Sequence, residues 1–383
     1  MAVAPTPTPS PSAPPSPTAT ASPTASPSGY ILAKSLAGAE DLLANFPVEL
    51  GLQVAWGHGQ IPGRYASDEG AFRFICGGDG MLVKDDPVLF YNQKGASHLH
   101  QAWGNGMFDA TVTPGSLAAN AVTNCNATPY SLNRSSYWMP ALIHEGGDVI
   151  RPDLVMVYYK RKMASSDACN SASPDFMGQC VGLPSQIRFI FGWDPTKPTK
   201  TSQGASWYCT GVDGHFPNLD DLFNAGCKPG ADLLADTVAP NCWDGKHLDS
   251  PDHRSHISYF EHDPNTGKGR CPSSHPYLIP QEENKAQYTV TADMIGTRAD
   301  GSKYSRVRLS SDAMLPGGKA GATLHADYME AWVSAGKKLW MDNCIDKGLD
   351  CSGGDVGNGK QLIGASQPTY GWRNPNARVS WNP

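Results

Sequence analysis

The sequence predicts a mainly β protein: one β-sandwich or jelly-roll-like domain with long disulfide-tied loops and a few short helices. Short segments rich in β-branched and aromatic residues recur between Gly, Pro, Asn and Asp. Helical periodicity is scarce. Ten cysteines are spread through the chain without a CxxC pair, which favours a disulfide framework over a zinc ribbon or a redox motif.

The N-terminal segment, residues 1–29, is expected to be a disordered linker. From Ala4 to Ser28 it contains only Pro, Thr, Ser and Ala, so it has no apolar surface to bury. Segments of this composition usually join a secreted catalytic domain to a binding module, and Met1 is followed by no apolar signal run. We therefore expect residues 30–383 to form one monomeric globular domain, tethered to a carbohydrate-binding module in a longer protein.

Strands are expected wherever β-forming residues lie between turn signals. The predicted strands are 71–76, 88–91, 155–160, 187–191, 257–260, 288–292 and 307–309. The segment 154–159 is a nearly continuous apolar run, as expected of a central strand. Helices are expected only over 36–45 and 327–344.

The cysteines and the charge balance limit where the protein acts. An even cysteine count predicts five disulfides and an oxidising, extracellular compartment. Their connectivity stays open, except that Cys169–Cys180 and Cys344–Cys351 are expected as short-range pairs. A net charge of -6 without a basic run argues against a nucleic-acid partner. No apolar stretch reaches about 18 residues, so no membrane span is predicted.

The pair His98 and His100 is the clearest candidate for chemistry. Two residues apart on a strand, the two imidazoles project from one face. Such a pair can bind one metal ion or act on one substrate. The alternative is that each ring only donates a hydrogen bond within the fold.

Further histidines occur in polar segments. Within residues 243–256 they accompany acidic residues and an arginine, and the candidate catalytic residues there are Asp252, His253, Arg254 and His256. The alternative is a loop in which Asp252 pairs with Arg254. His325 could supply a third nitrogen to the first pair, with Asp327 orienting its ring. Alternatively, His325 and Asp327 mark a helix start.

Tryptophan is frequent, and several of these residues lie beside polar positions. Their rings could stack on the C–H faces of sugars, or they could fill the core. The candidate substrate-binding residues are Trp103, Asn105, Trp138, Trp243, His275 and Tyr328. No HExxH, GxSxG or phosphate-binding loop occurs, and no spacing selects a glycosidase-type pair of carboxylates.

An ordered series of motifs resembles one known family. The series contains FRFIC at 72–76, DP at 86–87, GASHLH at 95–100, YWMPAL at 137–142, DHRSH at 252–256, CPSSHP at 271–276 and LHADY at 324–328. It is similar to the secreted family named domain of unknown function nineteen ninety-six, of fungal and actinobacterial extracellular proteins. That resemblance implies secretion and a carbohydrate context, because members sometimes carry carbohydrate-binding or cell-wall modules. It implies no catalytic mechanism.

These observations favour a secreted enzyme that cleaves a polysaccharide as a hydrolase or lyase. Its centre would contain His98, His100, His325 and Asp327, with an imidazole as general acid or base. One alternative is a metal-dependent enzyme in which the three histidines bind copper or zinc. Another is a non-catalytic glycan-binding or cell-wall-associated domain.

Overall fold

The computed structural model describes residues 29–55, 68–126, 129–197, 202–364 and 377–381. The predicted linker, residues 1–29, lies outside this part of the chain except for Gly29. The expectation of a single domain over residues 30–383 stays a prediction.

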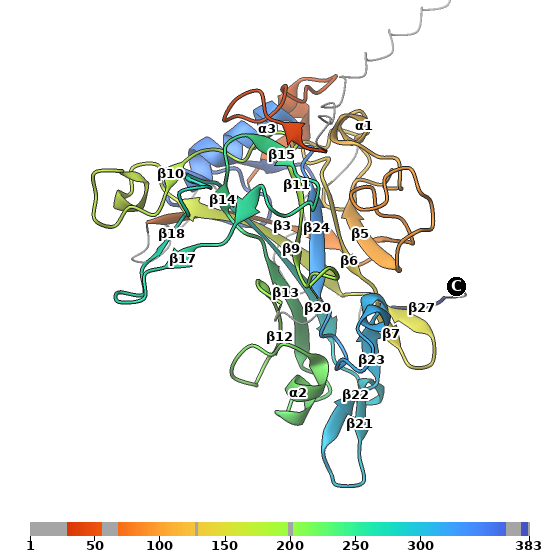
Figure 1. Cartoon of the computed structure of the whole chain (residues 1–383). Coiled ribbons are helices and arrows are strands. Elements are labelled where there is room, and N and C mark those ends of the chain that lie inside the picture. Colours follow the sequence, from red (N-terminus) through yellow and green to blue (C-terminus); the bar gives the residue numbers. More distant parts are fainter. Residues whose placement is uncertain (1–28, 56–67, 127–128, 198–201, 365–376, 382–383) are drawn as a thin grey trace, which may run out of the picture.

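Two large sheets pack face to face, which confirms the predicted β-sandwich class (Figure 1). The six-stranded sheet has the order β12 (Ala205–Cys209), β13 (Asp232–Val238), β20 (Gln281–Thr289), β9 (Leu154–Lys162), β3 (Glu69–Gly77) and β25 (Asp350–Cys351). The five-stranded sheet has the order β11 (Arg188–Gly192), β24 (His325–Met329), β6 (Ser136–Pro140), β5 (His100–Gly104) and β4 (Met81–Val83). Neighbouring strands are antiparallel except β25 and β3, which are parallel.

Smaller sheets and short helices surround the sandwich. One four-stranded sheet contains β10 (Gln179–Cys180), β19 (Tyr277–Leu278), β14 (Cys242–Trp243) and β16 (Ile257–Ser258), and the other contains β23 (Val307–Leu309), β7 (Leu142–His144), β8 (Asp148–Ile150) and β27 (Arg378–Ser380). Four two-stranded ribbons pair β1 (Ile31–Leu32) with β15 (His247–Asp249), β2 (Leu52–Val54) with β26 (Lys360–Leu362), β17 (Glu261–His262) with β18 (Gly269–Arg270), and β21 (Ile295–Thr297) with β22 (Lys303–Ser305).

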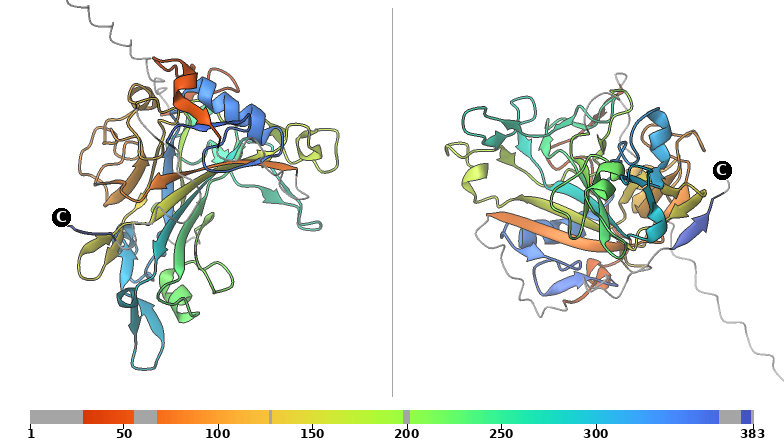
Figure 2. Two further views of the ribbon diagram at one scale, coloured as in Figure 1. Left: turned by 180° about the vertical axis from the view of Figure 1, so that it is seen from behind. Right: turned by 90° about the horizontal axis from the view of Figure 1, so that it is seen from below.

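The helices are α1 (Pro114–Ala118), α2 (Leu219–Asn224) and α3 (Ser334–Trp340), with one-turn elements η1 (Val48–Gly51), η2 (Asp167–Cys169), η3 (Ala292–Met294), η4 (Ser310–Met314) and η5 (Met341–Ile345). The β21–β22 hairpin projects from the body of the molecule (Figure 2). No described helix is long and apolar enough to span a lipid bilayer.

The main core lies between the two large sheets. Along β9, buried and half-buried residues alternate strictly, because successive side chains point to opposite faces. Val157 and Tyr159 of β9 and Phe74 of β3 face inward and belong to the same apolar cluster as Tyr137 and Tyr328 of the opposing sheet. Full burial of such side chains contributes about 1.5–3 kcal/mol each, so this interface dominates the stability of the sandwich.

The other face of the five-stranded sheet carries a second, smaller core. Trp138 of β6 lies opposite Ala102 of β5 on one side and opposite Asp327 of β24 on the other. Trp138 and Ala102 pack there with Phe108 and Ile190. Polar residues of the candidate site share this face, because side chains on a strand alternate with a period of two.

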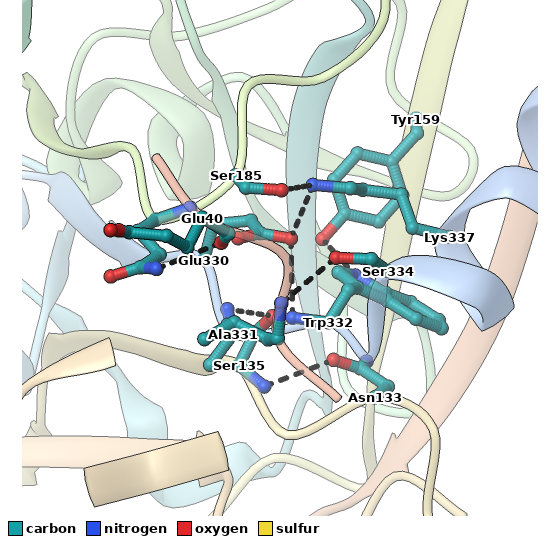
Figure 3. Close-up of polar contacts among 12 residues, drawn as sticks. Glu40, Asn133, Ser135, Tyr159, Ser185, Glu330, Ala331, Trp332, Ser334 and Lys337 are labelled. Atoms are coloured by element: carbon teal, nitrogen blue, oxygen red, sulfur yellow. Dashed lines mark hydrogen bonds and ion pairs between the residues drawn. The ribbon is translucent and has the colours of Figure 1, made fainter. Parts of the chain in front are cut away.

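Helix α3 packs over one end of the sandwich through a buried ion pair (Figures 2 and 3). The Lys337 ammonium lies 3.0 Å from a Glu330 oxygen and donates to the Ser185 hydroxyl at 2.7 Å. The same carboxylate accepts the backbone N–H groups of Gln186 and Trp332. Glu330 therefore joins the end of β24, the approach to β11 and α3 at one buried point.

Three local predictions are wrong. Residues 88–91 form a turn instead of a strand, because the Asp86 carboxylate accepts the N–H groups of Val88 and Leu89. Residues 36–45 form no helix, since Gly38 has a φ of 101° and bridges to Ser185. The predicted helix 327–344 begins only at residue 334, because residues 327–329 belong to β24. Two predicted strands hold only in part, because β16 covers just the first two residues of 257–260 and β20 just the first two of 288–292.

The disulfide prediction is confirmed. All ten cysteines are paired: Cys76–Cys125, Cys169–Cys180, Cys209–Cys227, Cys242–Cys271 and Cys344–Cys351. The two short-range pairs expected from the sequence are among them. Each disulfide typically stabilises a fold by about 2–4 kcal/mol through its restriction of the unfolded chain.

Candidate metal centre

Three histidines converge on the outer face of the five-stranded sheet. The ring centroids of His98 and His100 are 4.1 Å apart, and that of His325 lies 5.2 Å from His98 and 6.3 Å from His100. One nitrogen of each ring lies within 4.8 Å of the other two, and no other such group of potential metal ligands occurs among the described residues. The predicted convergence of these three residues is therefore confirmed.

The sheet register brings the three rings together. His100 is the first residue of β5 and lies opposite Pro140 of β6. His325 is the first residue of β24, and the alternation along β24 places it on the same face as Asp327. His98 precedes β5 by two residues, so its ring lies beside that of His100. Residues more than 200 positions apart thus meet because β6 lies between β5 and β24.

Backbone carbonyls fix the tautomers of His100 and His325. Nδ1 of His100 lies 3.1 Å from the Asp85 carbonyl oxygen, and Nδ1 of His325 lies 2.8 Å from the Thr323 carbonyl oxygen. A carbonyl oxygen can only accept, so both Nδ1 atoms carry the proton. The lone pair of each neutral ring is therefore on Nε2, the atom that can bind a metal.

A serine hydroxyl fixes the tautomer of His98. The Ser310 hydroxyl donates its only proton to the Leu99 carbonyl oxygen, and its oxygen lies 3.0 Å from Nδ1 of His98. Because its only proton is already donated to Leu99, this oxygen can only accept a hydrogen bond from His98. All three histidines consequently direct an Nε2 lone pair away from their anchoring hydrogen bonds.

Two aspartates hold the loops that provide these anchors. Asp85 accepts the backbone N–H groups of Gly95 and Ala110, which fixes the loop whose carbonyl binds His100. Asp312 accepts the hydroxyl of Thr323 and the backbone N–H of Gly321, which fixes the carbonyl that binds His325. These groups outside the ligand set orient the rings before any ligand arrives.

Burial keeps the three rings neutral. His100 is 0% exposed and His325 is 6% exposed, whereas His98 is less completely buried. Burial lowers the pKa of His98 to about 4. Burial, and then the charge of a protonated neighbouring imidazole, lower the pKa values of His100 and His325 well below the ordinary value. Nε2 of His100 is buried and has no hydrogen-bond partner in the described part of the chain, so its lone pair is available.

The sequence predicts that Asp327 orients the ring of His325. That prediction is wrong, although Asp327 lies on the same strand face as this centre. The Thr323 carbonyl occupies Nδ1 of that ring, and neither carboxylate oxygen of Asp327 has a hydrogen-bond partner among the described residues. Burial, followed by the Asp86 carboxylate, raises the pKa of Asp327 well above its ordinary value, while the charge of Arg254 lowers it. Asp327 thus presents a buried carboxyl group on the face that carries His325.

The other predicted catalytic residues serve mainly to attach the 249–256 segment to β11. His256 is fully buried and contacts the Ser250 hydroxyl and the Arg188 carbonyl. Nδ1 of His253 lies 2.8 Å from the Asp249 carboxylate.

The remaining two members of this group differ in their position. Asp252 is exposed and accepts the hydroxyl of Ser250 and the N–H groups of Arg254 and Ser255. It therefore stabilises the loop and does not join the histidines. Only the Arg254 guanidinium acts on the centre, through its charge on His325 and Asp327.

The predicted substrate-binding residues are largely internal. Trp103, Trp138, Trp243 and Tyr328 are at most 2% exposed, and Asn105 donates to backbone carbonyls while 2% exposed. None of the four rings presents a face to solvent. His275 is half-buried, and its Nε2 contacts the Ser255 carbonyl.

Several residues of the site escaped the sequence analysis. Ser310 follows a predicted strand and carries no motif of its own. Asp85 and Thr323 contribute backbone carbonyls, which no side-chain pattern reveals. Asp86 was visible only as part of the family-like series.

Comparison with protein families identifies one match. The family model described as a domain of unknown function, DUF1996, matches residues 86–332. Comparison with curated proteins and with solved structures gave no match. The matched range includes His98, His100 and His325, and it covers well over half of the sequence. The chain therefore belongs to the DUF1996 family.

Proposed function

We propose that this protein is a metal-dependent extracellular enzyme whose histidine centre binds one divalent cation through Nε2 of His98, His100 and His325. The observation that carries the proposal is the arrangement of the protons. Each Nδ1 is committed to an acceptor, which leaves Nε2 of each ring with its lone pair, and one nitrogen of each ring lies within 4.8 Å of the other two. Metal-binding histidines characteristically use one nitrogen for the ion and donate from the other.

The donor set fits zinc or copper. Both ions accept neutral imidazole nitrogens, and three protein ligands leave a position for water or substrate. Zinc bonded at 2.0–2.1 Å to three tetrahedrally placed nitrogens would hold them about 3.4 Å apart, so the rings need to move only slightly from their present positions. The rings are neutral at neutral pH, and a cation therefore meets lone pairs without first displacing protons.

A bound divalent cation would supply Lewis acidity and would lower the pKa of a coordinated water. The chain provides two further groups beside it. The Asp327 carboxyl, which has no other hydrogen-bond partner in the described residues, can accept or donate a hydrogen bond at the centre. The Arg254 charge can offset negative charge that develops there.

We further propose a polysaccharide as the substrate and secretion as the setting. The five disulfides and the Pro/Thr/Ser-rich N-terminal composition support an extracellular protein, and the family-like motif series supports a carbohydrate context. A purely glycan-binding role receives less support. Seven of the tryptophans in the described part of the chain are at most 2% exposed: Trp103, Trp138, Trp193, Trp207, Trp243, Trp332 and Trp340.

Metal analysis tests the proposal directly. The full chain, produced in an oxidising compartment, is treated with EDTA, dialysed and titrated calorimetrically with Zn²⁺ and with Cu²⁺. We expect one ion per chain, and loss of that binding in His100→Ala and His325→Ala. His215→Ala is the matched control, because His215 is exposed and its ring contacts Ser206 and Tyr208, away from the three histidines. Absence of stoichiometric binding, or equal binding by all variants, would refute the metal centre.

Activity is measured separately on a panel of polysaccharides. The products are analysed for new reducing, unsaturated and oxidised ends, with and without the ion. Metal-dependent release of such ends is expected. If the protein binds the ion but alters no glycan, the proposed metal centre stands and the proposed polysaccharide substrate is refuted.

A further inference from the structure

A cavity of about 400 Å³ lies beside β11. Its lining includes Ile190 and Gly192 of β11 and residues 257–261. We propose that this cavity is the subsite that binds one uncharged sugar unit of the substrate next to the histidine centre. The inference rests on the proposed function for its role, but its ligand binding can be tested without the metal.

The cavity lies one strand from the centre. Gly192 lines the cavity and is the register partner of His325. A Cβ atom on Gly192 would lie 2.7 Å from Cα of His325 and 2.8 Å from the Leu324 carbonyl oxygen. The close approach of these two strands means that a ligand in the cavity is held beside the strand that carries His325.

Arg254 links the cavity to the histidine centre. It lines the cavity and donates to the carbonyl oxygens of Gly192 at 3.3 Å and Trp193 at 2.8 Å. Its charge also acts on His325 and Asp327. A substrate chain leaving the cavity beside Arg254 therefore approaches the proposed metal ligands.

The charges of the cavity favour an uncharged ligand. The Lys197 ammonium lies 3.3 Å from the Asp194 carboxylate, and the charge of that carboxylate also acts on Arg254. Both cations of the lining thus have an anionic neighbour, which leaves little attraction for an acidic sugar. Glu261 adds a further negative charge at the rim.

The remaining lining combines hydrogen-bonding groups with an apolar surface. Ser258 donates its hydroxyl proton to the Tyr259 carbonyl, so its oxygen can accept from a ligand hydroxyl. Phe260 is half-buried and makes no ring–ring contact among the described residues, so its ring can pack on the C–H face of a sugar. Tyr259 fixes this wall, because its hydroxyl contacts the Val238 carbonyl at 2.7 Å. The volume falls within the range of about 300–1,000 Å³ that is usual for small-ligand pockets.

A larger cavity, of about 610 Å³, fits the role less well. Its lining includes the ion pairs of Lys162 with Asp68 and of Lys268 with Asp175. It shares no lining residue with the cavity beside β11, and it contains neither a histidine nor a register partner of β24.

Calorimetric titration of the EDTA-treated full chain with hexasaccharides tests the subsite. The probes are cellohexaose, xylohexaose, mannohexaose, maltohexaose and chitohexaose, with hexagalacturonic acid as the charged comparison. We expect at least one neutral hexasaccharide to bind and the acidic one to bind at least tenfold more weakly. Phe260→Ala should weaken the neutral interaction at least tenfold. Tyr304→Ala, on the distant β21–β22 hairpin, is the matched aromatic control and should leave it unchanged.

A second variant guards against misfolding of Phe260→Ala. Ser258→Leu narrows the cavity without truncating its aromatic wall, and it should weaken binding similarly. The subsite is overturned if no neutral hexasaccharide binds, if hexagalacturonic acid binds best, or if both folded variants bind as the wild type does. Sugar binding without any metal uptake would refute the proposed metal centre while retaining the subsite, and metal uptake without sugar binding would do the reverse.

Discussion

Nδ1 of His98 lies 3.0 Å from the Ser310 hydroxyl oxygen, although 212 positions separate the two residues. Because Ser310 donates its own proton to Leu99, its oxygen can only accept from His98, and the Leu99 carbonyl, 3.4 Å from the same Nδ1, is a second and longer acceptor. The centre therefore depends on a serine that no motif identifies.

Ser310→Ala is expected to weaken metal binding. Without the hydroxyl, Nδ1 of His98 keeps only its longer contact to the Leu99 carbonyl, at 3.4 Å, so the ring is held less firmly. Loss of such a supporting contact typically costs about 10–100-fold in metal affinity. Ser310→Thr keeps the hydroxyl and should restore most of the affinity. Competition titration with a chromogenic chelator measures the change.

The matched control for Ser310 is Ser274→Ala. Ser274 makes the same kind of contact, at 2.9 Å to Nδ1 of His275, outside the centre. It should bind metal as the wild type does. If Ser310→Ala and Ser274→Ala show the same affinity, Ser310 does not position His98.

Gly192→Ala is expected to disturb the centre through the backbone. Gly192 has a φ of 87°, and an added Cβ would collide with the β24 backbone at His325. The left-handed conformation alone costs about 1–2 kcal/mol in a non-glycine residue. Displacement of β24 should in addition reduce metal affinity, which calorimetry measures alongside chemical unfolding.

Gly211→Ala separates these two effects. Gly211 has nearly the same φ, 86°, but no atom lies within 4 Å of its added Cβ. It should lose stability and keep full metal affinity. Equal metal affinity in both alanine variants would contradict the inferred contact between β11 and the centre.

Lys337→Met is expected to destabilise the fold strongly. It removes the ammonium from a Glu330 carboxylate that is 0% exposed, and an uncompensated buried charge typically costs about 3–5 kcal/mol. Guanidinium unfolding at neutral pH measures the loss. Lys338→Met, which removes an exposed contact to Asp342, should change the free energy of unfolding by about 0–1 kcal/mol. Similar losses of unfolding free energy in the two variants would show that the buried ion pair stabilises the fold no more than the exposed one.

Asp236→Asn is expected to alter how stability depends on pH. Burial, and then the Glu283 carboxylate, raise the pKa of Asp236 from 3.8 to about 6, while Lys285 opposes the shift. Between these values the folded state holds a proton that the unfolded state has lost. Stability contributed by this group is therefore present below pH 4 and lost as the pH rises to about 6, by an amount on the order of 2–3 kcal/mol.

The variant lacks this loss, so its stability relative to the wild type should increase from pH 4 to pH 7. Urea unfolding at each pH measures the difference. Asp213→Asn, at an exposed loop position, serves as the control. Parallel pH profiles for Asp236→Asn and the wild type would contradict the raised pKa.

The sequence alone determined the β class, the five disulfides and the choice of His98 and His100 as the leading candidate residues. These properties follow from local composition and from the period-two geometry of a strand, as in 71–76 and 155–160, which both lie within strands. Local signals misled where the tertiary structure prevailed. His325 and Asp327 belong to a strand because β11 and β6 provide hydrogen-bonding partners on both sides.

Only the tertiary structure decided which histidines meet and which nitrogen each one presents. The anchors are the carbonyls of Asp85 and Thr323 and the hydroxyl of Ser310, and their positions depend on loop geometry. Likewise, Trp103, Trp138 and Trp243 have polar neighbours in sequence but lie in the core, because adjacent strand residues face opposite sides. The sequence gives the identity of each side chain. The hydrogen-bond partner that sets the tautomer of a histidine, however, can lie far away along the chain, and only the folded structure brings the two together.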